Sequence, residues 1–194
     1  MKSQRIISFA VIFMLSFLTL HVSSPNALVK ADNIIEEVKP EVLVQLKPLN
    51  VPPINSSFKT YMDYRTITNQ TSAQYKLIKE WSWCDDNGFL RVYGEKEFGI
   101  DDYYVVALGS YYGSCMGTKY KFTTDTGNVF YGILGDQKSD RHTNSSHQYS
   151  FNNDVVEFIV DTKKLNKTVK KMGSANVYMP LNGSIINIEQ VEFI

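Results

Sequence analysis

Proline is absent from most of this 194-residue sequence: none of its six prolines lies between residues 54 and 179. Glycine recurs through the same stretch, between short runs rich in Val, Ile, Tyr and Phe. Such runs are typical of β-strands, and the glycines are typical of the turns that join them. The absence of proline therefore favours one compact, strand-rich domain in this part of the chain.

An excess of charge of either sign is also missing, since 20 basic residues balance 20 acidic ones. No field of the whole chain then attracts nucleic acid or an anionic membrane surface, so neither is expected as a partner. A neutral ligand or one of mixed charge fits better. The apolar run over residues 6–20 is shorter than the roughly 20 residues that a membrane-spanning helix needs.

The start of the chain predicts export. Lys2 and Arg5 precede the apolar run, and Val29-Lys30-Ala31 offers small residues at the two positions that a signal peptidase reads. We therefore expect a signal peptide over residues 1–31, a secreted chain that begins at Asp32, and membrane contact only through the signal segment before cleavage. An uncleaved membrane anchor is the alternative.

The rest of the chain divides into three parts. Four prolines, at positions 40, 48, 52 and 53, interrupt residues 32–57 and predict an extended spacer. A lead-in segment with one short helix is expected over 58–84, where Thr71 and Gln74 form a capping box. Residues 85–194 are expected to form the domain. Its strands are predicted at 88–93, 103–108, 118–124, 129–134, 155–160, 176–179 and 185–193.

The connections favour a particular β architecture. Asp125-Thr126-Gly127-Asn128 separates two strand candidates and predicts a hairpin. A second short helix is expected over 163–172, capped by Thr162 and closed by Gly173. Several short strands with so little helix favour a small closed barrel over a sandwich.

Two cysteines, Cys84 and Cys115, leave three alternatives open. An even number of cysteines in an exported chain favours a disulfide, which would stabilise the fold by roughly 3 to 4 kcal/mol. The two thiols could instead stay free and half-buried. The third alternative makes Cys115 a nucleophile with His142 or His147 as its base. It is disfavoured because Cys115 leads into a strand and not into a helix, whose dipole would lower the thiol pKa.

Two carboxylates are notable for their apolar neighbours. Asp136 follows the run Ile133-Leu134-Gly135, and Glu157 lies inside the strand expected at 155–160. A charged acid buried in an apolar strand costs several kcal/mol, so it is placed in a pocket, paired or kept protonated. A carboxyl group that stays protonated can serve as a general acid. The plainer alternatives are a turn at Asp136 and a cross-strand lysine partner for Glu157.

A metal site is a weaker interpretation of the same region. Oxygen and nitrogen atoms sufficient for a divalent ion are present in Asp136, Asp140, His142, His147 and Glu157. However, Lys138 and Arg141 lie between these residues, and no spacing matches a zinc signature. We therefore expect a solvated loop here, with no metal and no cofactor.

Four short pieces of the sequence carry a resemblance to a known family: Val106-Ala107-Leu108-Gly109, Gly117-Thr118, Gly135-Asp136-Gln137-Lys138 and Val156-Glu157-Phe158. They resemble the 3D domain, a family of small double-psi β-barrels in bacterial wall-associated proteins that is named for three aspartates. Asp136 falls at the second aspartate and Glu157 at the third, whereas Gly109 stands where the first would be. The loop from 139 to 153 is longer than the family usually carries. Uncharacterised exported proteins of Gram-positive bacteria and their phages share similar pieces.

The resemblance covers about residues 85–193 and implies a six-stranded double-psi-like barrel that cleaves peptidoglycan as a lytic transglycosylase. Asp136 would be the general acid and then the base. Glu157 would raise the pKa of Asp136 or stabilise the positive charge that develops on the sugar. Lys138 and Arg141 would meet a carboxylate of the sugar or the stem peptide. Three tyrosines would stack on sugar rings: Tyr111, Tyr112 and Tyr131. Because the first aspartate is missing, a module that binds peptidoglycan or another wall glycan without cleaving it is the alternative.

Overall fold

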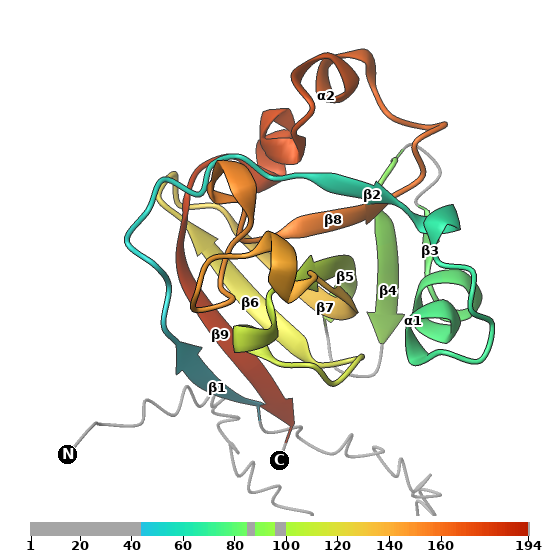
Figure 1. Ribbon diagram of the computed structural model, residues 1–194, viewed down its shortest axis with the longest axis horizontal. Coiled ribbons are helices and arrows are strands. Elements are labelled where there is room, and N and C mark those ends of the chain that lie inside the picture. The colour runs from blue at the N-terminus through green and yellow to red at the C-terminus, as the bar shows by residue number, and fades with distance from the viewer. Residues whose placement is uncertain (1–43, 85–87, 96–99, 194) are drawn as a thin grey trace, which may run out of the picture.

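The computed structural model describes residues 44–84, 88–95 and 100–193, so the expected signal peptide and residues 32–43 of the spacer lie outside it. Nine strands in the described residues form one mixed sheet (Figure 1). They are β1 (Val44–Leu49), β2 (Tyr61–Asp63), β3 (Trp83–Cys84), β4 (Arg91–Glu95), β5 (Ile100–Leu108), β6 (Lys119–Thr124), β7 (Val129–Gln137), β8 (Glu157–Val160) and β9 (Ile185–Phe193). The main path runs β1-β9-β6-β7-β5-β4-β3, while β8 pairs with β5 and with β2.

The helices are short. Helix α1 (Ala73–Tyr75) continues into a π-helical turn (Lys76–Trp81), and α2 spans Lys167–Met172. Single 3₁₀ turns lie at Tyr64–Thr66, Ser110–Tyr112, Asp140–His142, Phe151–Asn153, Ala175–Val177 and Met179–Leu181. Both expected helices exist, but their caps are Ser72 and Asn166, which lie further along the chain than Thr71 and Thr162. Thr162 is not a cap because its hydroxyl donates to the carboxylate of Asp63.

The predicted hairpin is confirmed. Strands β6 and β7 pair antiparallel, from Lys119 opposite Ile133 to Thr123 opposite Val129. Gly127 adopts a φ of 85° in the turn between them. Glycine is suited to this position because it has no Cβ to clash in the left-handed region. Side chains of β6 alternate between half-buried and buried, as expected for a strand with one face on the core. The prediction for β9, residues 185–193, is correct in both of its bounds.

Strand β5 is the centre of the sheet, since it pairs with parallel β7 on one side and with antiparallel β4 and β8 on the other. Its side chains alternate between two apolar clusters, one on each face of the sheet. Val106 and Leu108 belong to the larger cluster, and Val105 and Ala107 to the smaller. A strand covered on both faces reads as a continuous apolar run, which is why it could be predicted.

The fold is mainly β with a few short helices, as predicted, but the closed six-stranded barrel is wrong for the described residues. The end strands of the main path, β1 and β3, do not pair with each other. Strands β4 and β8 share one side of β5: β4 pairs with Tyr103 and Tyr104, and β8 with Val106 and Ala107. The sheet therefore forks at β5 instead of closing on itself. Figure 1 shows this branch, with β2 and β8 side by side.

Part of the expected spacer belongs to the sheet. Strand β1 pairs with β9 along its whole length although it contains Pro48. Proline is tolerated there because β1 is an edge strand, with one side free of partners. Further along, Ser56 is buried, and its hydroxyl accepts a hydrogen bond from the backbone N–H of Ile185 at 2.8 Å. Residues 44–57 thus pack onto the domain, whereas the sequence favours a spacer outside it.

The strand expected at 176–179 is wrong, because this stretch forms 3₁₀ turns. The turns are held by Lys59, whose side chain is buried beneath them. Its ammonium donates hydrogen bonds to Asn176 Oδ1 at 3.2 Å, to the carbonyl of Ser57 at 3.3 Å and to the carbonyl of Gly183. Lys59 therefore ties the segment before β2 to the segment before β9.

Candidate active site

Strand β5 brings Asp136 and Glu157 to one face of the sheet. Ala107 of β5 pairs with Asp136 of β7 on one side and with Glu157 of β8 on the other. Residues paired directly across neighbouring strands point to the same face. Strands lie about 4.8 Å apart, so the two Cα atoms are separated by about 10 Å, with the small Ala107 methyl group between them. Two residues 21 positions apart thus lie on one face of the sheet, on either side of β5.

A β-bulge puts Asp136 on that face. The register of β5 and β7 shifts just before Ala107, so Gly135 is an extra residue in β7. Without the shift Gly135 would oppose Ala107, and Asp136 would point to the opposite face. Gly135 is required here for space, because a Cβ at this position would lie 2.3 Å from a methyl group of Val105. Bulges often direct a side chain at a functional site in this way.

Burial shifts the pKa of both carboxyl groups upward. Burial raises the pKa of Asp136, against a smaller opposing effect of the backbone N–H of Gln137. Burial also raises the pKa of Glu157, opposed by the charge of Lys138 and assisted by the charges of Asp154 and Asp136. The side chain of Glu157 is 26% exposed, so it is shielded but still reachable from solvent. A partly accessible carboxyl with a raised pKa has the properties of a general acid.

A buried ion pair supports Glu157. Lys138 Nζ lies 2.6 Å from Asp154 Oδ2 and 4.0 Å from Glu157 Oε2, and the Lys138 and Asp154 side chains are 3% and 0% exposed. Thr60 donates a further hydrogen bond to Asp154 Oδ2, while Asp154 Oδ1 is buried without a partner in the described residues. Lys138 is therefore enclosed beneath the site and does not extend into solvent toward a ligand. The sequence reasoning missed Asp154 and Thr60.

The residues expected to bind sugar are only partly accessible. Tyr111 and Arg141 are exposed, on the 3₁₀ turns that follow β5 and β7. Tyr112 is buried, with burial raising the pKa of its hydroxyl, so its ring cannot stack on a sugar. Tyr131 is half-buried and packs edge-to-face against Tyr103, with ring centroids 6.1 Å apart. Tyr111 and Arg141 are therefore the two expected contacts that remain free to meet a ligand.

The long loop over residues 139–153 occupies the space beside Gly109. A Cβ at Gly109 would lie 1.9 Å from the carbonyl oxygen of His147. The backbone of the loop is thus in contact with the position at which the resemblance expects the first aspartate. No side chain fits at residue 109 beneath the loop, so an aspartate could not replace Gly109 with the loop in this position.

The cysteines and histidines of the described residues lie as follows. Cys84 and Cys115 are both free thiols, so the disulfide is not formed in this structure. Burial raises the pKa of Cys84, whose thiol lies 3.6 Å from the carbonyl oxygen of Phe89. His147 Nδ1 lies 3.5 Å from a carboxylate oxygen of Asp140. Within the described ranges, no three His, Cys, Asp or Glu side chains gather as metal ligands.

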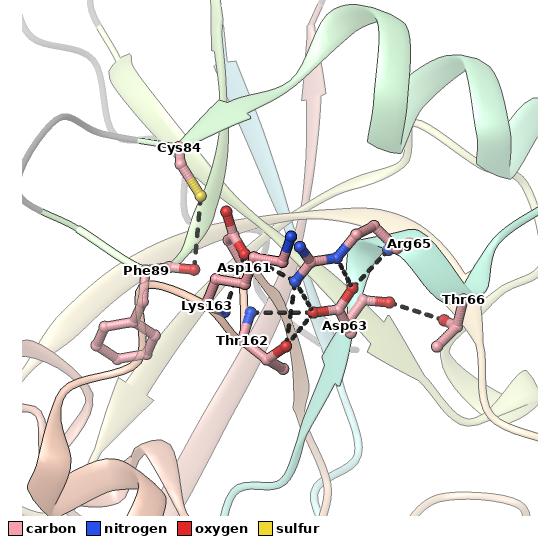
Figure 2. Close-up of polar contacts among 8 residues, drawn as sticks. All are labelled: Asp63, Arg65, Thr66, Cys84, Phe89, Asp161, Thr162 and Lys163. Carbon is pink, nitrogen blue, oxygen red and sulfur yellow. Dashed lines mark hydrogen bonds and ion pairs between the residues drawn. The ribbon is translucent and has the colours of Figure 1, made fainter.

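A second polar network fixes the strands that carry the site (Figure 2). Arg65 Nη2 lies 2.6 Å from Asp63 Oδ2 and 2.9 Å from Asp161 Oδ1, and the backbone N–H of Thr162 donates to Asp63 at 3.0 Å. The hydrogen bond from Arg65 holds the pKa of Asp63 well below its usual range. These contacts join the C-terminal ends of parallel β2 and β8. Glu157 stands at the opposite end of β8.

Two cavities are present in the described residues. One, of about 460 Å³, lies between the π-helical turn and the sheet, and its lining includes Lys76, Trp81 and Ile133. The other, of about 300 Å³, is an open hollow lined by residues 142–144 and 149–153 of the long loop. Neither of these two cavities is lined by Asp136 or Glu157.

Comparison with protein-family models, curated proteins and solved structures found no match to this chain. In the part of the chain that the structure describes, no helix combines the length and the apolar character needed to cross a membrane.

Proposed function

We propose that this chain is an exported protein that cleaves the glycan strands of bacterial peptidoglycan as a lytic transglycosylase, with Asp136 as the general acid and base. The observation that carries the proposal is the placement of Asp136 and Glu157 on one face, across β5, with both pKa values raised by burial. The short motifs that resemble the 3D domain support the same chemistry, and the apolar N-terminal run supports export.

The reaction uses a single carboxyl group twice, first as acid and then as base. The protonated carboxyl of Asp136 gives its proton to the glycosidic oxygen, and the bond from this oxygen to C1 breaks. Positive charge then develops on the sugar ring, and the ionised carboxylate of Glu157 stabilises it. The carboxylate of Asp136 next removes the proton from the C6 hydroxyl, whose oxygen bonds to C1. The product is a 1,6-anhydro sugar, and Asp136 is protonated again.

Lys138 and Asp154 have a positioning role in this proposal. The ammonium of Lys138 lies 4.0 Å from Glu157 and opposes the rise of its pKa. Asp136 has no cation among the groups that perturb its pKa, whereas Glu157 has Lys138. On this difference in surroundings we assign the acid role to Asp136 and the charge-stabilising role to Glu157, since carboxyls in different environments can divide these tasks.

A glycan-binding module without catalysis is the second candidate. The observation that favours it is that neither of the two cavities is lined by Asp136 or Glu157. Binding alone would use the exposed Trp81 and Tyr111 and would not need a protonated acid.

The test is digestion of insoluble peptidoglycan by the purified full-length protein, with the soluble products separated and weighed by mass spectrometry. We expect anhydro-muropeptides, which are lighter by one water than hydrolysis products. Asp136→Asn should abolish their release while Asp125→Asn, which changes an exposed turn carboxylate, should not. Release by Asp136→Asn at the wild-type rate would remove Asp136 from the mechanism. Retention on the wall without release by the wild type would favour the binding module.

A further inference from the structure

The two ends of the long loop over residues 139–153 are joined by the buried pair of Lys138 and Asp154. Lys138 directly precedes the loop and Asp154 directly follows it, so their contact closes the loop at its base. Lys138 Nζ lies 2.6 Å from Asp154 Oδ2, and the two side chains are 3% and 0% exposed. Because a carboxyl C–O bond is about 1.2 Å long, Cγ of Asp154 lies within about 4 Å of this nitrogen. A small shift would bring the two atoms to the roughly 3 to 3.5 Å at which a bond can form.

Both partners are held in place by their neighbours. The backbone N–H of Lys138 donates to the carbonyl of Leu108 at 2.9 Å, and the carbonyl of Asp154 accepts from the backbone N–H of Ser150 at 2.9 Å. The hydroxyl of Ser150 also accepts a hydrogen bond from Lys138 Nζ at 3.2 Å. Two groups oriented in this way react as if each were present at about 10⁵ to 10⁸ M.

Burial favours an uncharged link between the two side chains. Taking an ammonium and a carboxylate out of water carries a desolvation cost, which a neutral amide largely avoids. Asp154 Oδ1 is buried without a partner in the described residues. An unpartnered oxygen costs more on a charged group than on a neutral one, so this oxygen suits an amide carbonyl better than a carboxylate.

Glu157 supplies a group that can carry protons. Its Oε2 lies 4.0 Å from Lys138 Nζ, and its side chain is 26% exposed. Burial raises the pKa of Glu157, so it holds a proton more readily than an ordinary glutamate. The hydroxyl of Thr60 donates to Asp154 Oδ2, which draws electrons from Cγ and favours attack on it.

From this arrangement we infer that Lys138 and Asp154 condense to an intramolecular amide bond, with Glu157 as the proton carrier. One proton of the ammonium passes to Asp154 Oδ2, which leaves a neutral amine and a neutral acid. Nζ then bonds to Cγ. The Cγ–Oδ2 bond breaks as Glu157 gives its proton to Oδ2, which leaves as water, and Glu157 recovers a proton from the nitrogen. The step needs no oxidant, reductant or further reactant.

The bond closes the long loop covalently and is independent of the proposed glycan cleavage. It limits the unfolded chain as a disulfide would, in a protein whose Cys84 and Cys115 are free thiols. Burial, the largest cause of the raised Glu157 pKa, is unchanged by it. The charges of Lys138 and Asp154, which oppose and assist that rise, are lost together.

Mass spectrometry of the purified full-length protein tests the bond. We expect the wild type to be lighter by one water than its sequence requires, and its tryptic digest to contain a branched peptide that joins Lys138 to Asp154. Lys138→Met should have the full mass of its own sequence. The matched control is Lys121→Met, which removes a lysine that is 23% exposed and paired with Glu189, and it should still lack one water. Lys138→Met breaks an ion pair and an amide alike, so mass and not stability distinguishes them.

A wild type with the full mass of its sequence, or a digest without the branched peptide, would overturn the inference. Loss of water from Lys138→Met would also overturn it, because the water would then come from another site. Glu157→Gln keeps the size of the side chain and removes the proton carrier, so it should lower the cross-linked fraction at least tenfold in protein that circular dichroism shows to be folded. A cross-linked fraction equal to that of the wild type would refute the role of Glu157.

Discussion

Replacing Lys138 by methionine tests the buried pair beneath the site. The substitution keeps most of the apolar stem and removes the ammonium that lies 2.6 Å from Asp154 Oδ2. Asp154 is then left as a fully buried carboxylate with the hydroxyl of Thr60 as its remaining partner. Breaking one side of a buried ion pair costs about 3 to 5 kcal/mol, a large share of the roughly 5 to 15 kcal/mol that stabilises a typical domain.

The matched control is Lys121→Met. Lys121 pairs with Glu189 across β6 and β9 at 3.3 Å, but these side chains are 23% and 19% exposed. An accessible pair contributes about 0 to 1 kcal/mol, so this variant should be nearly neutral. Urea unfolding, followed by circular dichroism, measures the free energy of unfolding of both variants. Asp154→Asn added to Lys138→Met should recover part of the loss, because it removes the unpaired charge. Equal midpoints for Lys138→Met and Lys121→Met would refute the reasoning.

Three further predictions concern single residues. Gly109→Ala should lower stability by about 1 to 3 kcal/mol, since its Cβ would lie 1.9 Å from the carbonyl oxygen of His147, and an unchanged melting temperature would contradict this. Arg65 holds the pKa of Asp63 below the ordinary 3.8, so Asp63→Asn should lower the free energy of unfolding at neutral pH. The difference in free energy between the wild type and this variant should disappear progressively as the pH falls below 3.8. A difference that stays constant during acid unfolding would contradict this prediction. Burial lowers the pKa of Lys59 from 10.5 to about 8, so the unfolded chain binds more protons between these values. The free energy of unfolding of the wild type should therefore rise with pH in this window relative to that of Lys59→Met. The same pH dependence in both proteins would contradict this prediction.

Much of the fold could be predicted because it depends on local patterns. Strand β9 and the β6–β7 hairpin follow from alternation and from a glycine turn. Strand β1 could not be predicted, since Pro48 argues against a strand unless the strand is known to lie at an edge. The strand prediction for residues 176–179 was wrong because the conformation of this segment depends on Lys59, which lies more than 100 residues away in the sequence and binds Asn176.

The sequence indicated which residues belong to the candidate site but not how they are arranged in space. Asp136 and Glu157 were recognisable as acids in apolar surroundings, but only the sheet order places both beside Ala107. The bulge at Gly135 has no signature beyond the glycine itself. Asp154 could have been noticed as an acid directly before the apolar pair Val155-Val156, yet its partner across the loop depends on tertiary structure.

The central claim is that Asp136 holds a proton at pH values where an ordinary aspartate has lost it. Carbon-detected NMR titration of the side-chain carboxyls measures this directly, with the Asp136 signal assigned by its absence in Asp136→Asn. We predict that Asp136 and Glu157 titrate above their ordinary values of 3.8 and 4.5, whereas Asp63 titrates below 3.8 in the same sample. Asp136 would then act as an acid at low pH, and glycan cleavage would decline as the pH rises through its pKa. A titration of Asp136 at or below 3.8 would contradict the account.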